Sequence, residues 1–236
     1  MNPWRLEVFE ELASTSDLCL ARAEAGEPAG LAVLALRQTA GRGSRGRGWL
    51  APVGNLNLSV LLRPDRPVAE SGHMALLAGI AVAEAIENAA GIATQLKWPN
   101  DVLLGGAKLA GILVETSPAV AKLDWLVLGI GINLAEAPDI PGRATTALRA
   151  HGEELAPRDA AAAVLAALAR WHERPAEAIR ETWLTRAHPL GTELTVQGRE
   201  PRQGRFAGLS PAGELLLACN DRIEPFSTGD VLLGRA

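Results

Sequence analysis

The sequence feature that most restricts the fold is a glycine- and arginine-rich segment at positions 41–49, which separates two apolar runs at 31–37 and 55–63. Four glycines are interleaved with three arginines there, and Trp49 ends the segment. Glycine accepts positive φ angles and lets a backbone approach a ligand closely. Arginine carries a rigid set of donors suited to carboxylate and phosphate. The segment therefore predicts a mobile loop between two strands that closes over an anionic ligand.

The segment admits other interpretations. Positions 41–46 fit the pattern Gly-x-Gly-x-x-Gly, but a dinucleotide-binding turn opens a helix, whereas Pro52 and Gly54 soon follow here. A phosphate-binding P-loop needs Gly-Lys-Ser/Thr, which the segment lacks. A solvated flexible loop is the plainest alternative. Contact with nucleic acid is another, and the acidic total charge disfavours it.

Length and composition limit the chain further. Its 236 residues are 48% hydrophobic and 21% charged, which suits one large domain with a substantial core and one small domain. The formal net charge of −4 means that any anion site is local. Cys19 and Cys219 lie far apart without a zinc-ligand spacing, as is typical of a reducing cytosol. No signal peptide or membrane span is expected, so the predicted location is the cytoplasm.

The hydrophobic pattern predicts an α+β arrangement with two domains, at 1–188 and 189–236. Helices are expected at 14–25, 69–90, 159–172 and after Pro175. Strands are expected at 31–37, 55–63, 94–98, 102–104, 109–115 and 125–134, with Gly105-Gly106 as a hairpin signal. Short strands at 193–196, 204–209, 214–218 and 222–226 then alternate with turns, which predicts a small all-β, barrel-like domain.

The strand predicted at 55–63 alternates in character. Leu56, Leu58 and Val60 face one way, and Asn57 and Ser59 face the other. The strand at 125–134 carries Gly129 and Gly131, and glycine within a strand often marks the close approach of a ligand or a backbone.

A second group of chemistry-bearing residues follows the loop. Lys97-Trp98-Pro99-Asn100-Asp101 combines a cation, an aromatic ring and short polar side chains, and Lys108 opens an apolar run. A tight turn and a surface lysine are the plain interpretations. The functional interpretation assigns these residues to phosphate and magnesium chemistry. The four histidines show neither the spacing of metal ligands nor a sequence partner for covalent catalysis. They are His73, His151, His172 and His188.

Taken together, these segments resemble the bacterial biotin protein ligases (biotin–[acetyl-CoA-carboxylase] ligases) over essentially the whole chain. Five segments carry the resemblance in order: Ser14-Thr15-Ser16, Gln38-Thr39 with 41–47, Lys97 to Asp101, 108–115, and Gly129-Ile130-Gly131-Ile132-Asn133. Each is weak or moderate alone, and the complete order is a strong signal. The resemblance implies a catalytic domain with a mixed central sheet flanked by helices, like class II aminoacyl-tRNA synthetases, and a C-terminal SH3-like β-barrel.

The resemblance also implies a role for each matching residue. Lys108 and Arg45 would be catalytic, and Asp101 would support a magnesium ion. The residues implied for biotin are Ser14, Thr15, Ser16, Gln38, Thr39, Gly41, Arg42, Gly43, Arg45, Lys108, Gly111, Leu113 and Gly129. The residues implied for ATP and the adenylate are Arg42, Arg45, Arg47, Trp49, Lys97, Asn100, Lys108 and Asn133.

The reaction implied by the resemblance has two steps. Biotin and ATP, with Mg²⁺, give biotinyl-5′-AMP and pyrophosphate, and a lysine of a biotin carboxyl carrier protein of acetyl-CoA carboxylase or a related carboxylase then takes the biotin. The glycine-arginine loop would shield the anhydride from water. The protein would act as a monomer or homodimer, away from membranes.

Two departures and two rival functions accompany the resemblance. Ser44 replaces an arginine of the family's loop, which removes one potential contact to phosphate or carboxylate, and Ser16 replaces an asparagine. Some family members begin with a DNA-binding repressor domain, for which the residues before Ser14 leave no room, so a ligase without a DNA partner is expected. The rival functions are a lipoate–protein ligase or octanoyltransferase of the same fold, and an adenylate sensor or nucleic-acid-binding module without catalysis.

Overall fold

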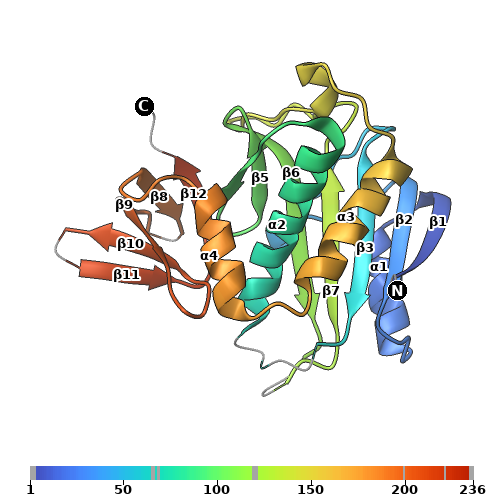
Figure 1. Ribbon diagram of the computed structural model, residues 1–236, viewed down its shortest axis with the longest axis horizontal. Coiled ribbons are helices and arrows are strands. Elements are labelled where there is room, and N and C mark those ends of the chain that lie inside the picture. Colours follow the sequence, from blue (N-terminus) through green and yellow to red (C-terminus); the bar gives the residue numbers. More distant parts are fainter. Residues whose placement is uncertain are drawn as a thin grey trace.

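A seven-stranded mixed sheet forms the larger part of the protein, and a five-stranded antiparallel sheet forms the smaller part (Figure 1). The computed structural model describes residues 4–64, 67, 70–118, 122–198, 200–220 and 222–233. The strands of the larger sheet lie in the order β1 (Arg5–Leu12), β2 (Leu31–Gln38), β3 (Leu56–Leu62), β7 (Leu126–Ile132), β6 (Ala107–Thr116), β5 (Asp101–Leu104) and β4 (Gln95–Lys97). Strand β1 runs parallel to β2, and the other neighbours are antiparallel. This is the predicted fold class.

Helices cover both faces of this sheet, which explains why its strands are so apolar. Helices α2 (Ser71–Ala90) and α3 (Pro157–Trp171) pack on one face, and α1 (Thr15–Glu24) packs on the other (Figure 1). Leu58 and Val60 of β3 point into the large core under α2 and α3, while Leu61 points towards α1. The alternation predicted for this strand is confirmed, and its polar face lies against the first residues of α1.

Local signals set the ends of the helices. Ser14 is the N-cap of α1, and its Oγ accepts a hydrogen bond from the Asp17 backbone N–H. Helix α2 ends at Gly91, which has a φ of 68°, as a left-handed C-cap requires. The first residue of the helix predicted at 69–90, residue 69, lies outside the described residues. Helix α4 (Ala176–Arg186) follows Pro175. None of the described helices has the length and apolar character needed to cross a membrane.

The hairpin between β5 and β6 confirms the turn predicted at Gly105-Gly106, whose φ angles of 59° and 80° both need glycine. Strand β1 was not predicted. It carries charged residues among its apolar ones and lies at the edge of the sheet, where one row of its backbone groups pairs with β2.

The C-terminal residues form a second sheet with the order β11 (Arg222–Phe226), β10 (Leu215–Cys219), β9 (Arg202–Leu209), β8 (Glu193–Gln197) and β12 (Asp230–Leu233). Four of these strands were predicted, and β12 was missed. Among the described residues no pairing joins β11 to β12, so the strands form an open sheet of the SH3-like type rather than a closed barrel. The division of the chain at residue 188 stays a prediction.

The segment that joins β4 to β5 connects the two sheets. Trp98 is buried, and its indole Nε1 donates to the Gly213 carbonyl at 3.1 Å. Lys97 Nζ donates to the Val231 carbonyl at 3.1 Å. Two residues of the Lys-Trp-Pro-Asn-Asp segment therefore hold the C-terminal sheet against the seven-stranded sheet.

We expect Trp98→Phe to destabilise the protein while leaving most of the ring packing intact. The substitution removes the indole donor and leaves the buried Gly213 carbonyl unpaired, at a cost of about 1–3 kcal/mol. Thermal unfolding should show a melting temperature lower by roughly 2–4 °C per kcal/mol lost. An unchanged melting temperature would show that this bond does not hold the two sheets together.

Candidate active site

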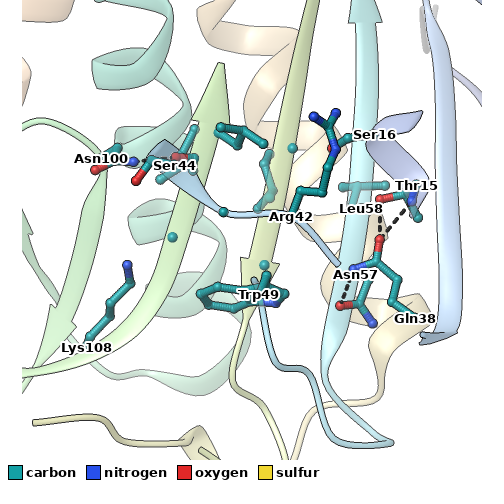
Figure 2. A pocket seen from close by; sticks show the side chains of 17 residues that line it. Thr15, Ser16, Gln38, Arg42, Ser44, Trp49, Asn57, Leu58, Asn100 and Lys108 are labelled. Atoms are coloured by element: carbon teal, nitrogen blue, oxygen red, sulfur yellow. Dashed lines mark hydrogen bonds between the residues drawn. The ribbon is translucent and has the colours of Figure 1, made fainter. Parts of the chain in front are cut away.

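A cleft opens where the glycine-arginine loop crosses β3, β7 and β6, and most of the predicted biotin-binding residues meet there (Figure 2). Its walls come from the start of α1, the end of β2, the loop and the three strands. The lining residues are Thr15, Ser16, Gln38, Arg42, Gly43, Ser44, Trp49, Asn57, Leu58, Asn100, Lys108, Gly111, Ile112, Leu113, Gly129, Ile130 and Gly131.

The glycines of β6 and β7 make room for side chains that lie over the sheet. Gly131 pairs with Gly111 across β7 and β6, and a Cβ atom at Gly131 would collide with the indole of Trp49. A Cβ atom at Gly129 would lie only 2.7 Å from Ser16 Oγ. The floor of the cleft therefore has to be glycine, and the groups that approach it closely are side chains rather than the ligand or backbone expected from the sequence.

One wall of the cleft is a network of uncharged polar groups. Gln38 Oε1 accepts from the Thr15 backbone N–H at 2.7 Å and from Thr15 Oγ1 at 3.0 Å. Ser59 Oγ lies 2.8 Å from Thr15 Oγ1 and 3.1 Å from Ser16 Oγ. Gln38 Nε2 donates to Asn57 Oδ1 at 3.2 Å (Figure 2). The sequence interpretation missed Asn57 and Ser59 as site residues, although their alternation with leucines in β3 was the signal that could have found them.

A β-bulge turns Lys108 towards the cleft. Asp101 pairs with Gly111, but two positions further along β5 Leu103 pairs with Lys108, so that β6 carries one extra residue, Leu109. Residues directly opposite each other in an antiparallel pair share a face, and a bulge reverses the facing of the residues beyond it. Lys108 therefore lies on the same face of the sheet as Asp101 and Gly111.

Asp101 joins the two predicted lysines. Its carboxylate is 7% exposed and lies 2.5 Å from Lys108 Nζ and 2.9 Å from Lys97 Nζ. Burial raises the pKa of Asp101, but the charges of Lys108 and Lys97 and their hydrogen bonds outweigh it and hold the pKa below its ordinary value. Lys108 Nζ also lies 5.7 Å from the centre of the Trp49 ring. The site thus presents two ammonium groups fixed by one ionised carboxylate.

The described side chains at this site do not form a metal centre that the protein could hold by itself. Both oxygens of Asp101 contact ammonium groups, and no three His, Cys, Asp or Glu side chains of the described residues gather as a metal site. Magnesium fits this place only as the companion of a nucleotide, with substrate phosphates as its main ligands. The assignment of Asp101 as its carboxylate ligand stays a prediction.

Arg42 lies across the cleft and faces two acids. Its Nη2 donates to Glu115 at 2.7 Å, and its Nε lies 2.7 Å from an Asp17 oxygen, which is a charge contact without the angle of a hydrogen bond. Its backbone pairs with Gly48, which closes the loop on itself. These contacts fix the predicted anion-binding arginine at the edge of the cleft.

The other two arginines lie at the outside of the loop. Arg45 is exposed and has a φ of 60°, which is unusual for a residue other than glycine, and it does not line the cleft. Arg47 donates to Ser44 Oγ at 3.1 Å and to Asp230 at 3.1 Å. Asp230 also binds Arg143, and although burial raises the pKa of Asp230, these two arginines hold it below the ordinary value. The C-terminal sheet therefore anchors the loop, which the sequence did not predict.

Four of the remaining predicted residues lie outside the lining of the cleft. Ser14 caps α1, and the Thr39 backbone N–H donates to the Leu12 carbonyl. Gly41 stands beside the cleft against the Trp49 carbonyl. Asn133 is buried and donates from its Nδ2 to the Thr146 carbonyl at 3.1 Å. Asn100, in contrast, lines the cleft, and its Nδ2 donates to the Ile112 carbonyl.

Comparison with known proteins agrees with this geometry. Residues 8–133 match the Biotin/lipoate A/B protein ligase family, and residues 191–234 match the Biotin protein ligase C terminal domain. The biotin–[acetyl-CoA-carboxylase] ligase of Paracoccus denitrificans is 38% identical over 78% of this chain and 82% of its own length. The bifunctional ligase/repressor BirA of Bacillus subtilis is 35% identical over 94% of this chain and 72% of its own length. The biotin protein ligase from Aquifex aeolicus in complex with biotin and ATP superposes with a TM-score of 0.81 at 30% identity, covering 98% of this chain and 99% of that one.

The fold and the site thus define a ligase class that attaches a small acid to proteins, and the chain belongs to the biotin/lipoate A/B protein ligase family. Within that family, its matching C-terminal domain and its relatives place it among the biotin protein ligases.

The anchor at Asp230 predicts the behaviour of the loop. We expect Asp230→Asn to weaken the contact with Arg47 and to raise the rate of trypsin cleavage after Arg45 and Arg47 by roughly three- to tenfold, which is the scale of losing one partly exposed charged hydrogen bond. Limited proteolysis followed by mass spectrometry measures this rate. The control is Glu200→Gln, which removes an exposed partner of Arg202 away from the loop. Equal cleavage of both variants would show that Asp230 does not anchor the loop.

Proposed function

We propose that the chain activates biotin with ATP and transfers it to a lysine of a biotin carboxyl carrier protein, with the residues of the cleft in the roles given below. The observation that carries the proposal is Lys108, which a bulge and Asp101 fix beside a glycine-floored pocket with an uncharged polar wall. A mostly apolar molecule that also carries one polar group and one carboxylate fits such a pocket, because its carboxylate would meet the ammonium groups of Lys108 and Lys97.

In the first step the biotin carboxylate attacks the α-phosphorus of ATP, and pyrophosphate leaves. Lys108 would stabilise the negative charge that gathers on the carboxylate and the α-phosphate oxygens. Lys97 lies on the far side of Asp101 and would meet the polyphosphate. A bound magnesium ion would offset the charge of the triphosphate. Arg42 and Arg45 would exchange their present surroundings for the carboxylate and the phosphates as the loop closes.

In the second step the amine of a carrier lysine attacks the carbonyl carbon of the mixed anhydride. An amide bond forms, the bond to AMP breaks, and the amine loses a proton to solvent or to the phosphate group of the released AMP. Until then the loop and Trp49 would keep water from the anhydride. Trp49 and Asn133 are proposed to hold the adenylate.

The carrier is proposed to be that of acetyl-CoA carboxylase or a related carboxylase, because the relative from Paracoccus denitrificans carries that carboxylase in its name. A cytoplasmic location and a monomeric or homodimeric state remain proposals. The family name also covers lipoate ligases. One assay separates the biotin ligase from the lipoate ligase: pyrophosphate exchange with ATP, Mg²⁺ and either biotin or lipoate. We expect exchange with biotin and none with lipoate. Exchange with lipoate would support the rival ligase, and exchange with neither would exclude both ligases and leave a transferase or a binding module.

We expect Lys108→Ala to lower biotin-dependent pyrophosphate exchange by about two to three orders of magnitude, the scale of losing one strong electrostatic donor. Far-ultraviolet circular dichroism should remain that of the wild type, because the lysine lies at the surface of the cleft. Exchange close to that of the wild type would remove Lys108 from the reaction.

We expect Asp101→Asn to lower the same exchange by up to about a hundredfold, because Lys108 loses the carboxylate that positions it. Raising the Mg²⁺ concentration separates this role from metal binding. A positioning role predicts that excess Mg²⁺ does not restore the rate. A rate restored by Mg²⁺ would instead assign Asp101 to the metal, as the resemblance implies.

A further inference from the structure

Two side chains of β3, Asn57 and Ser59, determine which atoms of the polar wall can donate hydrogen bonds to a ligand. Both are buried: Asn57 is 2% exposed and Ser59 is fully buried. Buried polar groups without access to water have to satisfy one another, so the direction of each hydrogen bond in the network is constrained by its neighbours.

Two backbone groups each constrain the orientation of the Gln38 amide. Asn57 Nδ2 donates to the Ala35 carbonyl at 3.3 Å, which leaves Asn57 Oδ1 to accept from Gln38 Nε2. Gln38 Oε1 must then face Thr15. Independently, the Thr15 backbone N–H can only donate, and it lies 2.7 Å from Gln38 Oε1. Both constraints give the amide of Gln38 the same orientation.

The direction in which each hydroxyl group donates then follows from that of its neighbour, because each hydroxyl has a single proton. Thr15 Oγ1 gives its proton to Gln38 Oε1, which is 3.0 Å away and can only accept. Ser59 must therefore donate to Thr15 at 2.8 Å. Ser16 must in turn donate to Ser59 at 3.1 Å. Ser16 Oγ is left with lone pairs only, and Gln38 Nε2 retains one proton that Asn57 does not use.

We infer that Ser59 is a positioning residue that makes Ser16 a hydrogen-bond acceptor in the cleft that also holds the free donor of Gln38, with Asn57 holding the Gln38 amide. The inference rests on the proposed function. An acceptor and a donor that line one cleft complement a ligand that carries both an N–H and a C=O, which is the chemistry of a cyclic urea. The dithiolane ring of lipoate has neither group, so the network selects the urea of biotin over lipoate.

The first test is Ser59→Ala, which frees the Ser16 proton to turn towards the cleft. The KM for biotin in pyrophosphate exchange should rise about 2- to 12-fold, the range for one neutral hydrogen bond. The KM for ATP and the rate at saturating biotin should stay unchanged. Desthiobiotin, which retains the urea but lacks the sulfur ring, should show the same factor as biotin. The control is Ser117→Ala, which removes another buried serine hydroxyl outside the cleft.

A double-mutant cycle distinguishes positioning from general damage. If Ser59 acts through Ser16, adding Ser59→Ala to Ser16→Ala should produce no further change in the KM for biotin. A merely structural effect would instead add to that of Ser16→Ala and would alter the KM for ATP. Ser59→Cys keeps the size and a weak donor, so its KM should lie between those of the wild type and Ser59→Ala, and it also serves if the alanine variant does not fold.

The outcomes separate this inference from the proposed function. A wild-type protein without biotin-dependent exchange would refute the proposed function. Biotin-dependent exchange together with an unchanged KM in both Ser59 variants, or with fully additive effects in the cycle, would refute the positioning role alone.

Discussion

The register of the central strands is the constraint on which the site depends. Gly131 of β7 pairs with Gly111 on one side and with Asn57 on the other, and Ser59 pairs with Gly129. Because facing alternates along a strand, a slip of one residue would move the glycines under the opposite helices and the leucines into the cleft. The leucines of β3 that fill the core under α2 and α3 therefore fix the position of the cleft as well as the stability of the sheet.

The bulge at Leu109 adds charge to this uncharged floor. A regular pairing would direct Lys108 into the apolar face of the sheet, where a lone ammonium group would be strongly disfavoured. Asp101 makes the bulged position favourable by sharing its carboxylate between Lys108 and Lys97. The same contact couples the reaction centre to the C-terminal sheet, because Lys97 also donates to the Val231 carbonyl.

The sequence predicted the parts of the fold that follow local rules. The period-two pattern of 55–63, the Gly105-Gly106 turn and the Ser14 cap all reappear in the structure. Strand β1 was missed because charged and apolar side chains are mixed along it. Its pairing with β2, a contact between segments that no local pattern shows, stabilises it as a strand. The resemblance brought Thr15, Gln38 and Lys108 to one cleft, as the structure places them. No local pattern could find the contact between Arg47 and Asp230, because 183 positions separate them.

The two kinds of polar group in the site are therefore arranged on different principles. Uncharged groups form the inner wall, where each proton has a fixed place and selectivity comes from the orientation of donors and acceptors. The arginines of the loop lie further out, and two of them are already paired with an acid: Arg42 with Glu115, and Arg47 with Asp230. An anionic ligand has to compete with these carboxylates, so it gains only the difference between two charge contacts. Recognition by the inner wall can then decide which acid is retained, while the loop responds to the negative charge that any acid and its nucleotide would bring.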